Sequence, residues 1–324
     1  MKIGIVLGDF SWPVPVSQLG QQITGVARFA DEAGIDSLWC MDHFFQIRMT
    51  GHPPESPMTE AYGLLGVLAG ATQRIRLGTL VTSVAYRHPG VLVKTVTTLD
   101  VLSGGRMNFG VGPGAPFDPP PQGPGTAFEV EGLGIPFPPL RDRFEMLEEL
   151  LQIARQMWRG DETPFDGKHY QLARPLCSPG PVQRPHPPIL IAGGGEKKTL
   201  RLVAEYADAC HLPGYAATVG GAELGGDLRR KLDVLREHCA AAGRDYHEIS
   251  KTVGIGFDLG DDAAGGRRGF LATLRALADT GFDHVIVSPR GPWTDASLTA
   301  LASLLPDIHA IAPESGGRLA GKAV

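Results

Sequence analysis

Eight short apolar runs, each followed by a segment of helical periodicity, restrict the fold of this sequence more than any other feature. The runs that we predict as strands cover residues 3–7, 37–41, 75–82, 106–111, 188–192, 209–212, 252–258 and 284–288. Parallel strands need helical crossovers between them, and eight such units close into a filled cylinder. We therefore predict an α/β protein with a (β/α)8 TIM barrel, formed by a single domain over residues 1–324.

The segments between these runs are typical of helices. Apolar residues recur at helical spacing over residues 19–33, and Gly34 is a common type of helix end. Further helices are predicted from about residue 59, over residues 89–102, after residue 139, over residues 196–207 and 227–242, after residue 267, and over residues 298–305. Two doubly wound halves are the alternative, but the first strand lacks the Gly-x-Gly-x-x-Gly turn that usually follows it in such folds.

Residues 110–125, GVGPGAPFDPPPQGPG, separate the fourth strand from its helix. No helical pattern begins within this stretch, so the helix N-terminus that a phosphate-binding turn needs is missing. A domain linker is disfavoured, because four strand-helix units stand on each side and only together close one barrel. We predict a long proline-rich insertion after strand 4, which forms an active-site loop over residues 112–139.

The side chains of this insertion that we expect to wall the substrate pocket are Phe117, Asp118, Phe128, Glu129 and Glu131. An ordered surface excursion without a ligand is the alternative. At the other end of the chain, we expect residues 311–324 to form a flexible tail.

Composition excludes several classes of protein. The net charge of −5 gives no field that attracts nucleic acid, and the basic residues are scattered. The four cysteines lie far apart, which favours reduced thiols over disulfides or zinc. The longest apolar run, residues 62–71, is too short to span a bilayer, and the chain begins without a signal-peptide pattern. We expect a cytoplasmic protein with a small-molecule substrate and with no nucleic-acid, membrane or metal partner.

Two strand ends carry candidate chemistry, because functional groups of such barrels lie at the carboxyl ends of the strands. His43, next to Asp42, could donate or accept a proton there; the alternative is a loop histidine whose ring binds backbone. The run from Gly193 to Gly195 follows a strand and precedes a predicted helix, so its amides could bind a phosphate. A tight turn that merely needs glycine is the alternative.

Several motifs together resemble the luciferase-like oxidoreductases, and most closely their actinobacterial coenzyme F420-dependent branch. They are DSLWCMDH (36–43), LGTLVT (77–82) with RHP (87–89), TLDVLSGGR (98–106), GLGIPF (132–137) with RFE (143–145), and IAGGG (191–195) with AD (207–208). The resemblance runs from residue 1 to about residue 310. It implies a bacterial-luciferase-like barrel with a flavin or deazaflavin in its mouth, and family members are often homodimers.

The resemblance also implies roles for individual residues. The histidine that matches His43 handles a proton or stabilises the reduced cofactor, and Asp42 orients it or borders the site. A non-proline cis peptide beneath the cofactor ring would join Leu80 to Val81. The positions that would contact the cofactor are Leu80, Val81 and Thr82, then Gly112, Pro113 and Gly114, and the phosphate loop Ala192, Gly193, Gly194 and Gly195.

Two positions depart from the sugar-phosphate and alcohol dehydrogenases of the family. Ala115 stands where these enzymes carry a proton-donating glutamate, and Ile47 stands where they carry a tryptophan. Both changes argue against a sugar-phosphate or simple alcohol substrate. They raise the question whether Asp118, Glu129 or Glu131 supplies the missing carboxylate.

The leading functional hypothesis is therefore F420-dependent hydride transfer to or from a small organic substrate, such as a secondary metabolite. An FMN-dependent monooxygenase, of the hydroxylating or Baeyer–Villiger type, keeps the same fold and is the first alternative. A flavin-binding protein without turnover is the second. A metal-dependent barrel hydrolase is disfavoured, because the first strand carries no histidine pair.

Overall fold

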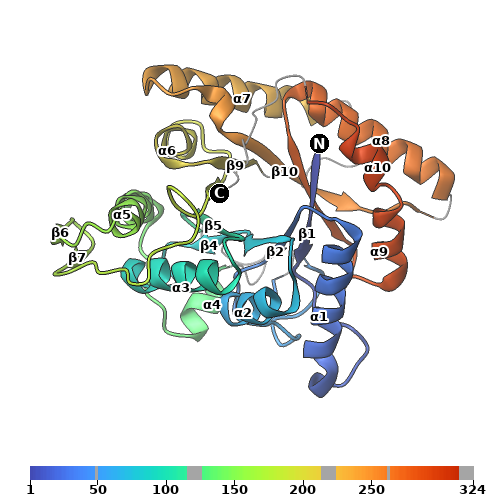
Figure 1. Cartoon of the computed structure of the whole chain (residues 1–324), viewed down its shortest axis with the longest axis horizontal. Helices are drawn as coiled ribbons and strands as arrows, with labels where there is room; N and C mark the ends of the chain where they lie inside the picture. Colours follow the sequence, from blue (N-terminus) through green and yellow to red (C-terminus); the bar gives the residue numbers. More distant parts are fainter. Residues whose placement is uncertain (48–49, 115–125, 213–223, 261–262, 314–324) are drawn as a thin grey trace.

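The computed structural model describes residues 1–47, 50–114, 126–212, 224–260 and 263–313. Its main sheet is parallel and closes into a barrel, with helices around the outside (Figure 1). The strands are β1 Lys2–Leu7, β2 Ser37–Cys40, β3 Arg76–Thr79, β4 Thr82–Ser83, β5 Met107–Gly112, β8 Ile189–Ala192, β9 Ala209–Leu212, β10 Ser250–Phe257 and β11 His284–Pro289. They follow the order β3-β2-β1-β11-β10-β9-β8-β5-β4, and β3 also pairs with β5. The predicted TIM barrel is confirmed.

The helices that cover this barrel follow the predicted sequence of units. They are α1 Val16–Ala33, α2 Ala61–Ala71, α3 Pro89–Leu102, α5 Leu140–Trp158, α6 Thr199–Tyr206, α7 Leu224–Ala241, α8 Ala263–Thr280, α9 Asp295–Ala302 and α10 Leu305–His309. Helix α6 begins three residues later than predicted, so the residues before Thr199 belong to the glycine loop. The helix predicted over residues 298–305 is two helices in the structure, α9 and α10. Helix α9 begins earlier than predicted, because Thr294 and Ser297 form a capping box at its start.

The predicted strand 75–82 is broken in the structure. A cis peptide joins Leu80 to Val81 between β3 and β4, at the bond that the family resemblance implies. The neighbouring strand β5 fits against this break only because residue 110 is glycine, since a Cβ atom there would overlap the carbonyl oxygen of Thr79. The Thr79 hydroxyl also donates to the Gly110 carbonyl at 2.9 Å. The two strands are therefore locked together beside the break.

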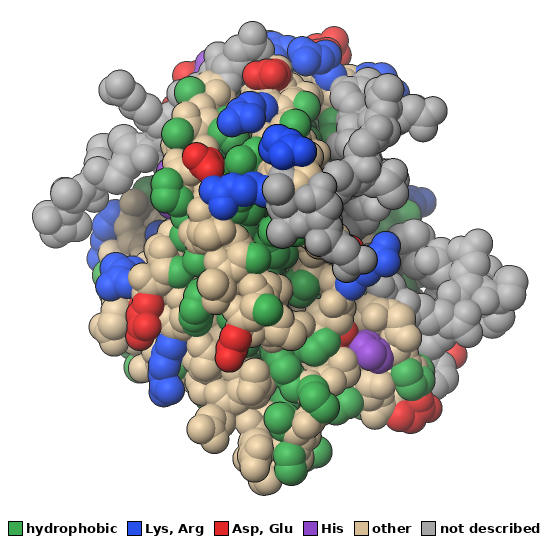
Figure 2. Space-filling view, turned by 90° about the vertical axis from the view of Figure 1, so that its right-hand side faces the viewer, with side chains coloured by type: hydrophobic (Ala, Val, Ile, Leu, Met, Phe, Trp, Pro, Cys, Tyr) green, Lys and Arg blue, Asp and Glu red, His purple; other side chains and the backbone are tan. Residues whose placement is uncertain are grey.

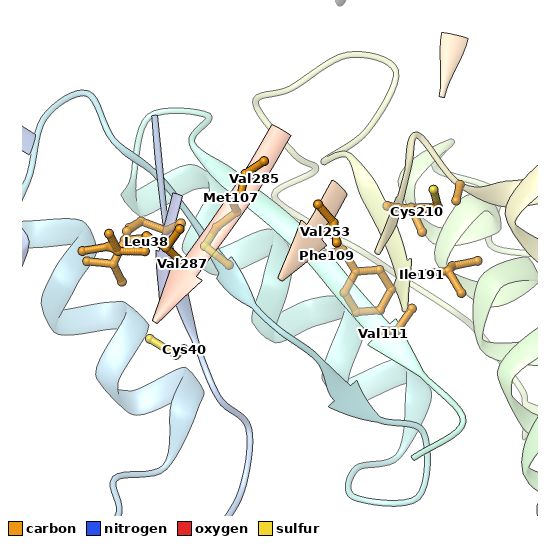
Figure 3. Close-up of a cluster of buried hydrophobic side chains, with 14 of the residues drawn as sticks. Leu38, Cys40, Met107, Phe109, Val111, Ile191, Cys210, Val253, Val285 and Val287 are labelled. Atoms are coloured by element: carbon orange, nitrogen blue, oxygen red, sulfur yellow. The ribbon is translucent and has the colours of Figure 1, made fainter. Parts of the chain in front are cut away.

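Alternation along the strands divides the core into two layers. Side chains that point outward from the strands fill the space between strands and helices. Figure 3 shows some of them, among them Leu38, Cys40, Phe109, Val111, Ile191 and Val285. Inside the barrel, Val6, Trp39, Leu190 and Ile286 form a second, smaller apolar cluster. Successive residues of a strand point to opposite faces, so one strand supplies side chains to both layers.

A polar layer also lies inside the barrel. His284 Nε2 lies 3.0 Å from the hydroxyl of Ser37, and His211 Nδ1 lies 2.8 Å from that of Thr252. Both histidines are buried, at 8% and 5% exposure. Burial, as the largest cause, lowers the pKa of His211 to about 4 and that of His284 to about 3. Both rings are therefore neutral at physiological pH.

The insertion after β5 contains an element that the sequence analysis missed. Helix α4, Thr126–Gly132, begins directly after the proline-rich stretch, although no helix start was predicted between the fourth strand and residue 139. A small hairpin of β6 Phe165–Asp166 and β7 Gln171–Leu172 was not predicted either. Residues 115–125, and the part of the expected tail from residue 314, lie outside the described residues.

The face of the molecule shown in Figure 2 carries no large basic patch. On that face, which is the right-hand side of Figure 1, Lys and Arg side chains are interspersed with Asp and Glu. Within the described ranges, no helix has the length and apolar character needed to cross a membrane. The same ranges hold no group of three His, Cys, Asp or Glu side chains placed to share a metal ion.

Candidate active site

His43 lies three residues beyond β2, at the carboxyl ends of the barrel strands. Its ring nitrogen Nδ1 lies 2.9 Å from Oε2 of Glu129, which comes from helix α4 in the insertion. The His43 side chain is 20% exposed and that of Glu129 only 2%. The imidazole therefore reaches the mouth of the barrel, while the carboxylate is covered.

Glu129 is held by more than the histidine. Its Oε2 also accepts a 2.7 Å hydrogen bond from the hydroxyl of Tyr86, and its Oε1 accepts from the amides of Phe44 and Phe45. Burial alone would raise the pKa of the Glu129 carboxyl, but the hydrogen bonds from His43, Phe44 and Tyr86 lower it below its ordinary value. The group is a buried carboxylate with four donors around it.

Asp42 does not have the place that the sequence analysis gave it as an orienter of His43. Its carboxylate forms a two-pronged ion pair with Arg87, at 2.6 and 3.0 Å, and is 1% exposed. Arg87 also pairs with Glu60 and lies over the rings of Tyr62 and Phe44. Burial raises the pKa of the Asp42 carboxyl, while the Arg87 guanidinium acts to lower it. The contact with the histidine belongs to Glu129, and Asp42 anchors the loop that carries His43.

The floor of the barrel mouth is apolar. Leu80, Val81 and Ala192 are half-buried and pack on the inner cluster that contains Trp39 and Leu190. Half-buried apolar side chains at the mouth suit a flat aromatic ring placed on top of them. Thr82, expected beside them, is fully buried, and its hydroxyl is bound by the hydroxyl of Tyr62 at 2.7 Å.

The glycine loop after β8 has the features of an anion site. Gly193 has a φ of 128°, a conformation that favours glycine, so the tight-turn interpretation holds for this residue. The amides of Gly194 and Gly195 donate no hydrogen bond to any residue in the described ranges. Lys231 of α7 lies at the loop, with Nζ 3.1 Å from the Gly194 carbonyl oxygen. Two amides and one ammonium group fit a phosphate.

Glu196 lies at the same loop and is compensated by two cations. Its carboxylate lies 2.8 Å from Arg230 and 3.6 Å from Lys231. Lys231 also lies 3.5 Å from Asp227, so the ammonium group is shared between two carboxylates. The loop therefore carries no excess of negative charge that would repel a phosphate.

The start and the end of the insertion are tied together by Arg143 of α5. Its Nη1 donates to the carbonyl of Pro113 at 2.6 Å, and its Nε donates to that of Pro138 at 3.0 Å. Its guanidinium also lies 3.9 Å from the centre of the Phe137 ring. Gly112 and Gly114, which flank Pro113, lie at the end of β5 on the same rim.

The remaining predicted site residues differ in what the structure says of them. Phe117 and Asp118 lie outside the described residues, as does the side chain of Phe128. Glu131 is exposed on α4, away from the His43 contact. Two residues of the site, Tyr86 and Lys231, were missed by the sequence analysis. Tyr86 could have been noticed, because it directly precedes the Arg87-His-Pro motif.

A family model described as luciferase-like monooxygenase matches residues 1–306. The chain belongs to this family. An F420-dependent glucose-6-phosphate dehydrogenase of Kineococcus radiotolerans is 31% identical over 84% of this chain and 68% of its own length. The enzyme of the same name from Amycolatopsis mediterranei is 30% identical over 70% of this chain and 61% of its own length, so the chain spans about two thirds of these luciferase-like relatives. The family and these relatives assign the chain to the oxidoreductases.

A solved structure shares the fold. An F420-dependent secondary alcohol dehydrogenase, in complex with an F420–acetone adduct, matches with a TM-score of 0.75. The match covers 95% of this chain and 98% of that one at 17% identity. At this identity the likeness supports the barrel and not a shared substrate.

Proposed function

We propose that this luciferase-like oxidoreductase uses coenzyme F420 to move a hydride to or from a small organic substrate. The observation that carries the proposal is His43, partly exposed at the barrel mouth beside the apolar floor of Leu80 and Val81. A proton-handling group next to a platform for a flat ring is what hydride chemistry needs from the protein. The names of the relatives support F420 as the cofactor.

Each part of the site has one task in this proposal. F420, when bound, supplies a carbon that accepts or donates a hydride. Leu80, Val81 and Ala192 support the ring from below and exclude water from that side. The free amides of Gly194 and Gly195, together with Lys231, bind the cofactor phosphate. His43 accepts or donates, at Nε2, the proton that accompanies the hydride.

The substrate of the relatives is not carried over to this chain. Ala115 and Ile47 replace the glutamate and the tryptophan expected in sugar-phosphate and alcohol dehydrogenases. Arg143 holds Pro113 and Pro138, which stand before and after residues 115–125 of the insertion. We therefore propose a substrate other than a sugar phosphate, such as a secondary metabolite.

The first alternative is an FMN-dependent monooxygenase, which the description of the family model favours. The same floor and the same phosphate loop would hold FMN, because both cofactors present a flat tricyclic ring and a phosphate. A flavin-binding protein without turnover is the second alternative. The identity of the cofactor separates the F420 proposal from the two flavin alternatives, and turnover separates those two from each other.

Titration of the purified protein with F420 and, separately, with FMN tests the cofactor. We expect F420 to bind with a Kd in the range of about 1 μM, typical of a preformed site, and FMN to bind at least about tenfold more weakly. Absorbance and fluorescence of the cofactor measure both titrations. Binding of FMN without F420 would overturn the F420 proposal and leave the two flavin alternatives, of which only the monooxygenase would consume oxygen.

The variant Gly194→Asp extends this titration to the phosphate loop. A Cβ at this position meets only the flexible end of Lys231, so the fold should tolerate the change. The new carboxylate would face the phosphate and pair with Lys231, so we expect cofactor affinity to fall by about tenfold or more. Gly25→Asp, on the exposed face of α1, is the control. Unchanged affinity in Gly194→Asp would place the phosphate elsewhere.

We also propose that the protein is a homodimer that associates through α2 and α3. Helix α2 carries no charged side chain, and Val67 on it is 55% exposed. On the adjacent helix α3, Val91 is 62% and Leu102 67% exposed. A contiguous exposed apolar surface on neighbouring helices is typical of a subunit contact, and the proposal is that these side chains belong to one. Sedimentation equilibrium should give twice the chain mass, and Val67→Glu should shift it to the monomer; a wild-type monomer would refute the contact.

A further inference from the structure

We propose that Glu129 is the positioning carboxylate of His43, and that it acts through the histidine rather than on the substrate. The inference rests on the proposed role of His43 in hydride transfer. In the sequence, Ala115 stands where related dehydrogenases carry a proton-donating glutamate. The carboxylate that contacts His43 comes from helix α4 and has a different task.

Burial and hydrogen bonding exclude Glu129 from direct contact with a substrate. Its side chain is 2% exposed, and each oxygen already has two donors. Two ionised oxygens offer about four acceptor positions in all, so none remains for a fifth partner. A group in this state cannot hand a proton to a substrate without the loss of several of its hydrogen bonds.

The same contact determines which nitrogen of His43 carries the proton. A carboxylate only accepts hydrogen bonds, so Nδ1 of His43 must be the donor across the 2.9 Å contact. In the neutral ring the other nitrogen, Nε2, is then an acceptor. His43 is therefore prepared to take a proton from a substrate at Nε2, and the adjacent carboxylate stabilises the cation that results.

The surroundings separate this pair from the second charged cluster of the loop. Asp42, Arg87 and Glu60 compensate one another. The ring of Phe44 packs on Tyr86 at 5.2 Å, while Arg87 lies over Phe44 at 5.4 Å. Of the charged side chains in the described ranges, Glu129 is the one in contact with the His43 ring. The Tyr86 hydroxyl donates to the same oxygen of Glu129, Oε2, that His43 contacts.

The test combines NMR of the cofactor-free protein with kinetics of the loaded enzyme. The nitrogen chemical shifts of His43 report which ring nitrogen is protonated, and we expect the Nδ1–H form in the wild type. Glu129→Gln keeps the shape but can donate as well as accept, so the preference for this form should be lost. Glu32→Gln, on the exposed side of helix α1, should leave the wild-type form intact.

Kinetics distinguish a positioning role from a merely structural one. We expect Glu129→Gln to lower kcat by about tenfold to 10²-fold with the cofactor Kd little changed, and Glu32→Gln to leave both unchanged. A wild-type Nε2–H form, or a kcat of Glu129→Gln within about twofold of the wild type, would overturn the proposal. The wild-type spectrum decides the matter even if the variant does not fold. The assignment of the protonated nitrogen of His43 holds whichever cofactor the protein uses, because the NMR spectrum is recorded without cofactor.

Discussion

Replacement of His43 by glutamine is expected to lower turnover by about 10²-fold or more, which is the usual loss when a general acid or base is removed. Glutamine can keep a hydrogen bond to Glu129 but cannot take up a proton at neutral pH. The cofactor binds through the floor and the glycine loop, so its Kd should remain close to that of the wild type. Steady-state turnover on the substrate, together with cofactor titration, measures the two quantities separately.

His247→Gln is a suitable control, because His247 is exposed and lies outside the barrel mouth. A matching loss in this variant would point to a general effect on the protein. If His43→Gln turned over as fast as the wild type, His43 would not handle the proton, and the role would have to pass to another group of the mouth.

Acidification below pH 6.5 is expected to destabilise the protein through its two buried histidines. The ordinary pKa of histidine is 6.5, and burial lowers it to about 4 for His211 and about 3 for His284. Between pH 6.5 and about 4 the unfolded chain binds protons that the folded barrel refuses, so stability falls as pH falls. One pKa unit corresponds to about 1.4 kcal/mol, so His211 alone accounts for about 3 kcal/mol across this window.

Denaturant unfolding at several pH values between 7 and 4 measures this loss. Asp31, whose hydrogen bonds lower its pKa, loses its contribution only below its ordinary value of 3.8. Burial raises the pKa of the Asp42 and Asp283 carboxyls, so these two groups act against the fall, and variants of the histidines isolate the share of the two rings. His211→Asn and His284→Gln place an amide where the bonded ring nitrogen lies and should flatten the pH dependence. His247→Gln should not. An equally steep fall in the double variant would contradict neutral burial of the two rings.

The order of strands and helices could be predicted from the sequence, because apolar periodicity is a local property. Residues 75–82 were predicted as one continuous strand, because each of them is common in strands. The apolar pattern gives no sign of the break at Leu80. The break was found only through the family resemblance. The start of α4 was missed because the prolines and glycines before it gave no periodic apolar pattern.

The site was predictable in part. His43 stood out as an imidazole at a strand end, and the glycine loop stood out by composition. The contact of His43 with Glu129 could not be predicted, because 86 residues separate the pair and the segment between β5 and α5 has no regular pattern. Asp42 was misjudged for the same reason: adjacency in sequence suggested a partner for His43, whereas Arg87, 45 residues away, takes its carboxylate.

Arg143 allows the segment between Pro113 and Pro138 to vary without a change in the rest of the barrel. One guanidinium holds the carbonyls of Pro113 and Pro138, so the two points where the excursion leaves and rejoins the barrel are fixed relative to α5. The cost of closing a loop grows only slowly with its length. Segments of different length or sequence can therefore be exchanged between these two points while strand β5 and the floor of the mouth keep their geometry. A barrel built in this way can acquire a new substrate by replacement of one excursion.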